Sequence, residues 1–326
     1  MSVHVLPFAL WHEAPSLPTP ATAALSQCLP GLSGWLSPAR AEALTRTGDA
    51  GHPSLNLPHE QAQARALGWP LVDGLLPWAA HAASEAGLAK PGDGSGWGFV
   101  TLCHWQVSHG LATLTDPQAL ALTEAEDQAL WAAMQPFFDE DGLRLHRWRT
   151  GQWLVGAPAL AQLPTAALER VIGEDVDAWR VGGEAPSAHA RVWQRLQNEM
   201  QMLLYTHAVN AQRRLPVNSF WLHGTGALPT APAHPGARAD APPEPPAPLP
   251  TAPQQALRRA WLARDLGAWL TAWQALDAQI DWSRVERLVL CGAHQARLYR
   301  AQARPWWQRL WPRSLQTAQV LAEDTP

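Results

Sequence analysis

Cysteine is scarce in this chain, and the cysteines that are present lie far apart. Cys28, Cys103 and Cys291 are odd in number among 326 residues. Such usage excludes a disulfide framework and CxxC-type zinc sites, and it favours a reducing compartment. We therefore expect a cytoplasmic protein.

Long hydrophobic runs and runs of basic residues are also missing. The first ten residues carry no basic segment before their short apolar run, and no apolar stretch approaches the roughly 18 residues of a membrane span. The 24 Lys and Arg residues form no long run, and the net charge is −4. A nucleic-acid-binding protein normally carries a concentration of Lys and Arg residues that makes its surface positively charged, and the sequence of this chain predicts no such surface. We expect neither nucleic-acid binding nor integration into a membrane.

Tyrosine and phenylalanine are rare, with two and five residues, whereas tryptophan occurs 19 times. The tryptophans are dispersed from Trp11 to Trp311. Large apolar side chains that are spread in this way are more typical of a core than of one binding surface. With 47% hydrophobic residues, the chain can bury such a core.

Short apolar segments at the two ends of the chain predict buried strands at Val3–Leu10 and Val285–Cys291. The short segments that adjoin each strand in the sequence are too small to bury both of its faces. We therefore expect the two ends to pair in one sheet of an α/β protein.

The middle of the chain predicts a β-hairpin and several helices. Trp97–Val107 and Leu111–Leu114 flank a turn at His109–Gly110. Thr123 and Glu126 form a capping-box signature at a helix start. Other predicted helices are Ala21–Cys28, His59–Leu67, Leu75–Ala86, Ala188–Thr206 and Gln254–Asp277, and other predicted strands are Leu143–Arg149, Gln152–Gly156 and Val217–Leu222.

Ten prolines between Pro229 and Pro253 divide the chain. A segment so rich in proline and so poor in large apolar residues predicts an extended or disordered linker. The expected organisation is an N-terminal part of the core over 1–119, an inserted α+β subdomain over 120–228, the linker over 229–253, and a C-terminal helix-strand unit over 254–326 that completes the core.

A group of polar residues around one helix end is the sharpest candidate for a binding site: Arg195, Asn198, Gln201, His207, Asn210 and Asn218. The first three share one helical face. Guanidinium and amide groups are suitable donors for a phosphate or carboxylate, which predicts a small anionic ligand. Alternatively, Asn210 and Asn218 cap turns and His207 bonds a carbonyl at the helix end.

His104 and His109 are the other candidate ligands, for a metal ion. Because they are five residues apart, their imidazoles point to opposite faces of a strand, and a shared ion would require a bend. We expect no metal there.

The tail Arg297–Arg313 combines five arginines with three tryptophans and a leucine. Pro305 and Pro312 interrupt any long helix, which favours packing of the tryptophans on the domain. The alternative is a docking surface for a protein partner or an anionic membrane surface.

Two short motifs resemble a known family. His207–Asn210 and Pro216–Asn218 are similar to the His-Pro-Val-Asn and Pro-Ala-Asn segments of archaeal-type cofactor-independent phosphoglycerate mutases, with departures at Ala208 and Val217. That family belongs to the alkaline-phosphatase-like superfamily, so the resemblance implies an α/β fold with a reduced alkaline-phosphatase-like sheet core and the inserted subdomain.

A second resemblance covers nearly the whole chain and is to the RpfE-type bacterial regulatory proteins. It is carried by the segments Pro58–Glu60, Asp73–Gly74, Pro77–Trp78, Cys103–Trp105, Leu163–Thr165, Arg170–Gly173 and Arg195–Leu204.

The mutase resemblance implies two divalent metals held by Asp and His, with a Ser or Thr nucleophile between them. The superfamily places its first ligand, in an Asp-Gly pair, at the end of the first strand. This chain has Phe8, Ala9 and Leu10 there. We therefore expect a non-catalytic regulatory or interaction protein that needs no cofactor and has a small anionic ligand or a protein partner. The alternative is a phosphoglycerate mutase or a related metal-dependent phosphatase.

Overall fold

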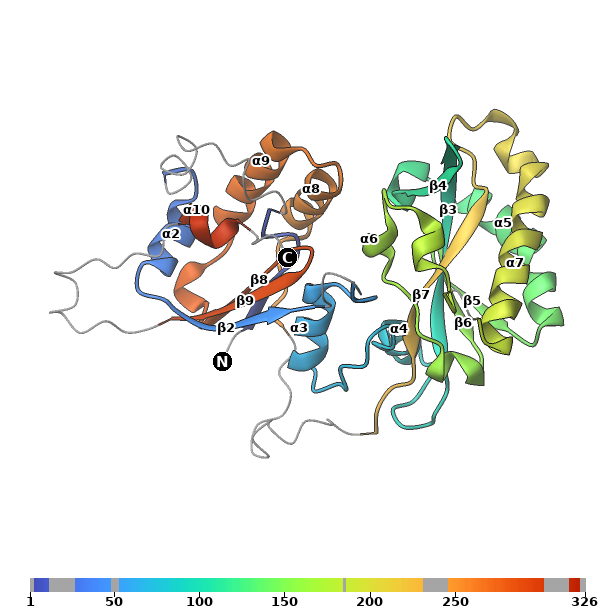
Figure 1. Cartoon of the computed structure of the whole chain (residues 1–326), viewed down its shortest axis with the longest axis horizontal. Coiled ribbons are helices and arrows are strands. Elements are labelled where there is room, and N and C mark those ends of the chain that lie inside the picture. The colour runs from blue at the N-terminus through green and yellow to red at the C-terminus, as the bar shows by residue number, and fades with distance from the viewer. Residues whose placement is uncertain are drawn as a thin grey trace, which may run out of the picture. The chain divides into compact units, whose positions relative to one another are not determined.

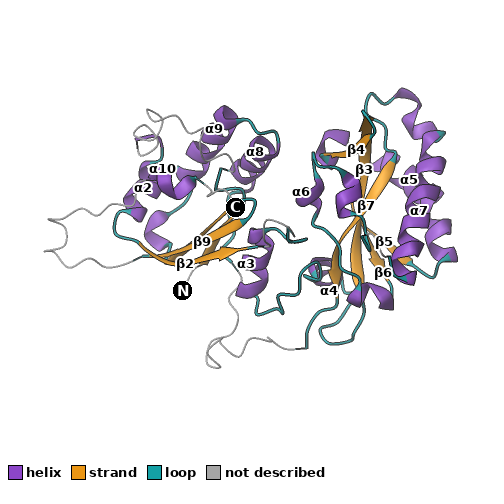
Figure 2. Ribbon diagram, viewed as in Figure 1, coloured by secondary structure: helices purple, strands orange, loops and turns teal. Residues whose placement is uncertain are grey.

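The computed structural model describes residues 3–11, 27–47, 53–183, 186–230, 246–301 and 317–322. The chain forms two compact units, which we call the terminal unit (residues 1–68 and 234–326) and the middle unit (residues 69–233). Each unit has its own sheet and its own helices (Figure 1). The predicted α/β class is confirmed by this alternation of helices and sheets (Figure 2).

The sheet of the terminal unit joins the two ends of the chain. Its strand order is β1-β8-β9-β2, with β1 parallel to β8 and the other pairs antiparallel. The pairing of β1 with β8 confirms the predicted contact between the chain ends. The strands are β1 (Val3–Leu6), β2 (Arg40–Arg46), β8 (Arg287–Cys291) and β9 (Gln295–Arg300).

Helices cover the two faces of this sheet unequally. Leu6, Leu288, Leu290 and Tyr299 point from the strands into a tryptophan-rich core. That core is closed by α2 (Pro30–Leu36), α8 (Thr251–Leu262), α9 (Leu266–Asp277) and α10 (Thr317–Leu321). On the opposite face, the described residues form a small cluster of Val5, Cys291 and Ala296 with Ala62 of helix α3 (Pro58–Ala66).

The single helix expected over Gln254–Asp277 is wrong, because α8 and α9 are separate helices. Arg264 between them has a φ of +55°, which ends α8. The side chain of Asp265 then accepts a hydrogen bond from the Ala268 amide and begins α9. Helix α8 also begins earlier than expected, at Thr251, within the segment expected to be linker.

The middle unit has a five-stranded antiparallel sheet in which β3 is central. Its strands are β3 (Trp97–Ser108), β4 (Leu111–Thr115), β5 (Arg144–Arg149), β6 (Gln152–Gly156) and β7 (Ser219–Gly226). Strand β3 pairs with β4, β6 and β7, and β5 pairs with β6. His109 and Gly110 both have positive φ in the β3–β4 turn, which confirms the predicted hairpin.

Both faces of this second sheet are covered. Helices α5 (Glu124–Glu140) and α7 (Ala188–Tyr205) close a core on Val100, Leu102, Phe220 and Leu222. Helices α4 (Trp78–Glu85) and α6 (Leu168–Val171) lie on the other side of the sheet (Figure 1). The predicted capping box of α5 is present in full, since Thr123 and Glu126 each bond the backbone amide of the other.

The division between the units falls at residues 68 and 69, whereas the inserted subdomain was expected to begin at residue 120. The reason is that β3 pairs with β6 and β7 and is therefore part of the middle unit's core. The linker residues 231–245 and most of the helix expected over Ala21–Cys28 lie outside the described residues. Among the helices that the structure describes, none has the length and apolar character needed to cross a membrane.

Candidate functional site

The polar helical face predicted from the sequence lies on the exposed side of α7. Arg195 forms an ion pair with Asp141 and a longer contact, 3.8 Å, with Glu199. Asn198 is exposed one turn further on, and Met202 and Tyr205 on this side are 79% and 87% exposed. Gln201 is half-buried. The guanidinium most suited to an anion is thus already paired with carboxylates.

The two asparagines of the candidate site bond to the backbone. The Asn210 amide donates to the carbonyls of Leu204 (2.8 Å) and Val217 (2.7 Å) and accepts from the Val217 amide (2.8 Å). Asn218 donates to the Trp105 carbonyl (2.9 Å) and accepts from the Trp105 amide (2.7 Å). The Asn218 side chain thereby continues the ladder beside β3. The alternative from the sequence had both asparagines capping turns, but Asn218 instead bonds the backbone of strand β3.

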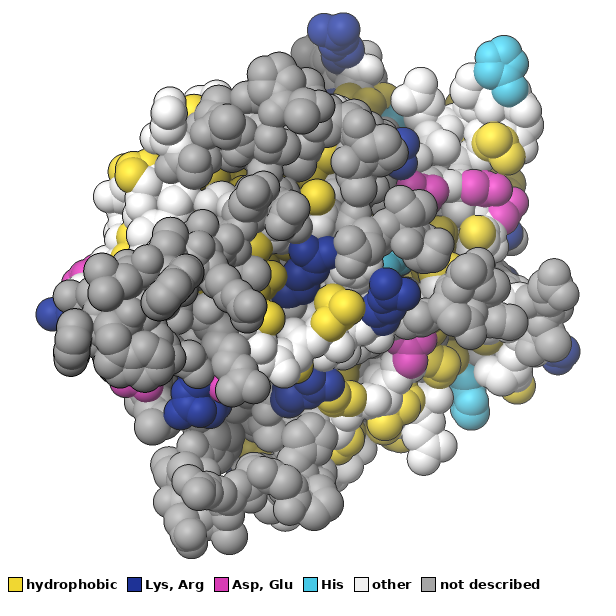
Figure 3. Space-filling view, turned by 60° about the vertical axis from the view of Figure 1, so that its left-hand side comes forward, with side chains coloured by type: hydrophobic (Ala, Val, Ile, Leu, Met, Phe, Trp, Pro, Cys, Tyr) yellow, Lys and Arg dark blue, Asp and Glu magenta, His cyan; other side chains and the backbone are white. Residues whose placement is uncertain are grey.

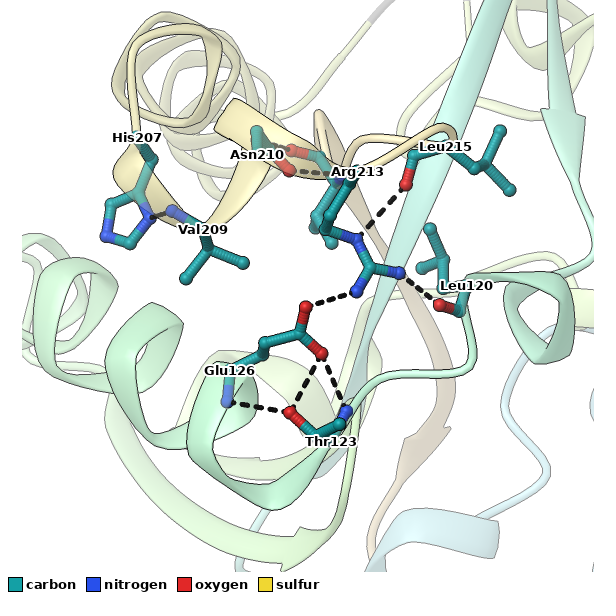
Figure 4. A network of polar contacts seen from close by, with 9 residues as sticks. Leu120, Thr123, Glu126, His207, Val209, Asn210, Arg213 and Leu215 are labelled. Atoms are coloured by element: carbon teal, nitrogen blue, oxygen red, sulfur yellow. Dashed lines mark hydrogen bonds and ion pairs between the residues drawn. The ribbon is translucent and has the colours of Figure 1, made fainter.

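His207 begins the short 3₁₀ helix Ala208–Gln212, where its Nδ1 accepts from the Val209 amide at 3.2 Å. Arg213 at the end of this helix is fully engaged (Figure 4). It donates to Glu126 Oε1 (2.5 Å) and to the carbonyls of Leu215 (3.2 Å) and Leu120. The Thr123 amide and then Arg213 lower the pKa of Glu126. A cavity of about 580 Å³ lies beside this network, and Arg213 is one of the residues that line it. Because the Arg213 guanidinium is already hydrogen-bonded, it is not available to bind an anion there.

The two candidate metal ligands are not brought together. His104 Nδ1 lies 2.9 Å from the Pro216 carbonyl oxygen, and His109 is in the exposed β3–β4 turn. In the described parts of the chain, no group of three or more His, Cys, Asp or Glu residues could hold a metal ion.

The loop Phe8–Trp11 after β1, which we call the β1 loop, is held by three tryptophan side chains from α8 and α9. The indole N–H of Trp269 donates to the Phe8 carbonyl at 2.9 Å. Trp273 donates to the Ala9 carbonyl at 3.2 Å, and Trp261 donates to the Leu10 carbonyl at 2.9 Å. Three consecutive carbonyls are therefore paired with three buried indoles.

Three amides of the β1 loop are paired as well. Those of Ala9 and Leu10 both donate to the Cys291 carbonyl, at 2.7 and 3.1 Å, and that of Trp11 donates to the Leu321 carbonyl at 2.8 Å. Phe8 has a φ of +59°, which is uncommon for a bulky residue. Its side chain is 4% exposed and packs against Trp261 and His59. The surrounding core thus enforces the conformation of the loop.

These residues do not fit the divalent metal that the superfamily resemblance implies at the end of the first strand. Phe8, Ala9 and Leu10 have no ligating side chain, and the indoles occupy their carbonyl oxygens. The sequence showed the missing Asp-Gly. It did not show that tryptophan indoles bond to the backbone carbonyls at this position, although Trp269 and Trp273 are spaced to share one face of a helix.

Thr225, in the Gly224–Gly226 segment of β7, is fully buried. Its hydroxyl lies 2.6 Å from the Leu163 carbonyl and 2.9 Å from the Thr165 hydroxyl. The Thr165 amide donates to the Gly74 carbonyl. Three segments that are far apart in the sequence therefore meet in one buried hydrogen-bond network.

A groove of about 230 Å³ lies on the less covered face of the terminal unit's sheet. Its floor comes from β1, β2, β8 and β9 and one wall from α3. The residues that line it are Val3, Ala43, Thr45, Pro58, Gln61, Ala62, Arg65, Ala66, Arg287, Val289, Ala296 and Leu298. Most of these are apolar, two are arginines and none is acidic. Sequence analysis missed this groove because its residues come from five separate segments.

Two buried titratable groups of the middle unit have shifted pKa values without forming a reactive site. Burial raises the pKa of the Cys103 thiol, which keeps it protonated. Burial also lowers the pKa of His223 to about 4, so this imidazole is neutral near pH 7. Its Nε2 lies 2.9 Å from the Thr101 hydroxyl.

No protein-family model matches this chain, and no curated protein matches it either. Among solved structures it is similar to a cofactor-independent phosphoglycerate mutase from Thermoplasma acidophilum DSM 1728, with 12% identity and a TM-score of 0.36. The match covers 98% of this chain and 95% of the mutase chain. A similarity this distant does not assign a reaction, so the function has to come from the site itself.

Proposed function

We propose that this chain is a non-catalytic regulatory or interaction protein on a phosphoglycerate-mutase-like scaffold, and that it binds a small anionic ligand. Kinship with the RpfE-type regulatory proteins and a cytoplasmic location are parts of the same proposal. They rest on the sequence segments and the cysteine usage described above.

The observation that supports this proposal is that the β1 loop has no metal-ligating side chain and that indoles bond to its carbonyls. Phosphoryl transfer in the superfamily that the sequence resembles needs two metal ions and a hydroxyl held between them. Here the loop at the corresponding strand end has apolar side chains. The carbonyls of Phe8, Ala9 and Leu10 accept from indoles, and the three amides that follow Phe8 donate to backbone carbonyls. Exchanging the loop for a metal site would leave three buried indole N–H groups unpaired, at a cost of about 1–3 kcal/mol each.

The test is an assay of purified, untagged protein for interconversion of 3- and 2-phosphoglycerate with added manganese, together with elemental analysis. We expect no turnover above a buffer control and no stoichiometric manganese or zinc. An archaeal-type mutase assayed in parallel shows that the conditions support the reaction.

Turnover that follows the protein through gel filtration and is abolished by a chelator would overturn the non-catalytic part. It would establish the alternative, a metal-dependent mutase or phosphatase. The anion-binding part is tested separately, as described next.

A further inference from the structure

The groove on the terminal unit combines an apolar floor with unpaired positive charge. Strands β8 and β9 contribute Val289, Ala296 and Leu298 to it, and α3 contributes Ala62 and Ala66. Removing such a surface from water is favourable by about 25 cal/mol per Å². An occupant with an apolar body would therefore gain free energy by covering it.

Arg65 of α3 and Arg287 of β8 both line this groove. Within the described parts of the chain, neither side chain has a hydrogen-bond or ion-pair partner. Arg300 on the neighbouring strand differs, because it contacts Glu42 at 3.5 Å. Each guanidinium of the groove offers five N–H donors in a planar fork that suits a carboxylate or phosphate.

We infer that this groove binds a small amphipathic anion, with its carboxylate or phosphate at Arg65 and Arg287 and its apolar body on the sheet. The inference rests on the anion-binding part of the proposed function and names the site and the ligand class. It moves the site from the α7 region, where Arg195 and Arg213 are already paired, to the terminal unit.

Size and charge narrow the ligand class. The volume of about 230 Å³ is below the roughly 300–1,000 Å³ of sites for drug-sized molecules, which favours a ligand of fewer atoms. A purely inorganic anion would leave the apolar floor uncovered, and a neutral apolar molecule would leave two guanidinium groups unused. Basic side chains also lie among hydrophobic ones on the face shown in Figure 3.

The experiment is isothermal titration calorimetry of the full chain with four probes: octanoate, octyl phosphate, inorganic phosphate and 1-octanol. We expect the two amphipathic anions to bind at least about tenfold more tightly than the other two, because only they use both parts of the groove. Comparison of octanoate with octyl phosphate distinguishes a carboxylate from a phosphate head.

Three variants locate the binding. Arg65→Gln and Arg287→Gln should each weaken octanoate or octyl phosphate by about tenfold or more, since each removes a charged donor. Arg259→Gln is the matched control, because Arg259 is an exposed arginine on α8 of the same unit. Ala43→Trp places a large side chain at an exposed groove position and should block the apolar body without touching either arginine.

The outcomes distinguish two claims: that the chain binds a small anion, and that the groove is where the anion binds. If the wild type binds no anionic probe, the anion-binding part of the proposed function fails as well. If the wild type binds but the Arg65, Arg287 and Ala43 variants bind equally well, the groove is the wrong site while anion binding stands. Unchanged melting temperatures of the variants show that any loss is not caused by unfolding.

Discussion

The two sheets of this protein differ in how completely helices cover them. The middle unit's sheet has α5 and α7 on one face and α4 and α6 on the other. Among the described residues, the terminal unit's sheet has a tryptophan-rich core on one face and the helix α3 against the other. All-parallel sheets are buried on both faces, whereas a sheet with mainly antiparallel pairs, like this one, can leave one face less covered. The difference shows that the described part of the terminal unit buries most of its apolar side chains on one face of the sheet, and the proposed ligand groove lies on the other face.

The tryptophans of the terminal unit illustrate how one face can suffice. Trp269 and Trp273 are completely buried, and their indoles satisfy backbone carbonyls as well as filling volume. The corresponding task in the middle unit falls to short polar side chains such as Asn210 and Asn218. In the β1 loop the indoles pair with the carbonyls, while the amides of Ala9 and Leu10 pair with the end of β8.

The largest expected effect is at Trp269, in the covered face of the terminal unit. Trp269→Ala should lower the free energy of unfolding by about 3–5 kcal/mol, because it opens a large cavity. Trp269→Phe keeps most of the apolar volume but loses the bond to Phe8, and should cost about 1–2 kcal/mol. Urea unfolding measures both. A phenylalanine variant as stable as the wild type would show that the indole bond contributes nothing.

The comparison of the sheets is tested most directly by a matched pair of leucines. Leu222 is 3% exposed in the middle unit's core, and Leu222→Ala should cost about 2–5 kcal/mol. Leu298 lies at the groove and is half-buried, so Leu298→Ala should cost only about 1 kcal/mol. Equal losses in thermal melting would mean that the groove face is packed like a core.

The middle unit should lose stability in acid through His223. Its pKa is about 4 in the folded chain, below its ordinary value of 6.5. Between these two pH values the unfolded chain binds a proton that the folded chain does not, so stability falls as the pH is lowered through this window and levels off below it. The loss should reach about 3 kcal/mol. His223→Gln should flatten this part of the pH profile of unfolding, and an unchanged profile would contradict the assignment.

Smaller effects than at Trp269 are expected at the backbone-bonding polar residues of the middle unit. Asn218→Ala should cost about 1–3 kcal/mol, because it leaves the amide and carbonyl of Trp105 without partners. His207→Ala should cost about 1 kcal/mol, since it removes one cap at a partly exposed helix start. Neither should change the affinity for octanoate or octyl phosphate. A specific loss of binding at unchanged melting temperature would return the ligand site to this region.

Local signals predicted many elements of the fold. The capping box at Thr123 and the two-residue turn at His109 depend on a few neighbouring residues, and both are present in the structure. Strand β2 was not predicted, because it is a largely exposed edge strand without apolar alternation. The break between α8 and α9 was missed because the tryptophan spacing continues across it, although Asp265 was a possible cap.

The sequence by itself determined the α/β class, the pairing of the two chain ends and the absence of an Asp-Gly pair after the first strand. These follow from periodicity, from the need to bury strand faces and from residue identity. Only the tertiary structure decided that three indoles close the β1 loop and that Arg65 and Arg287 share one groove. Such juxtapositions depend on contacts between segments more than 200 residues apart, which local sequence patterns do not encode.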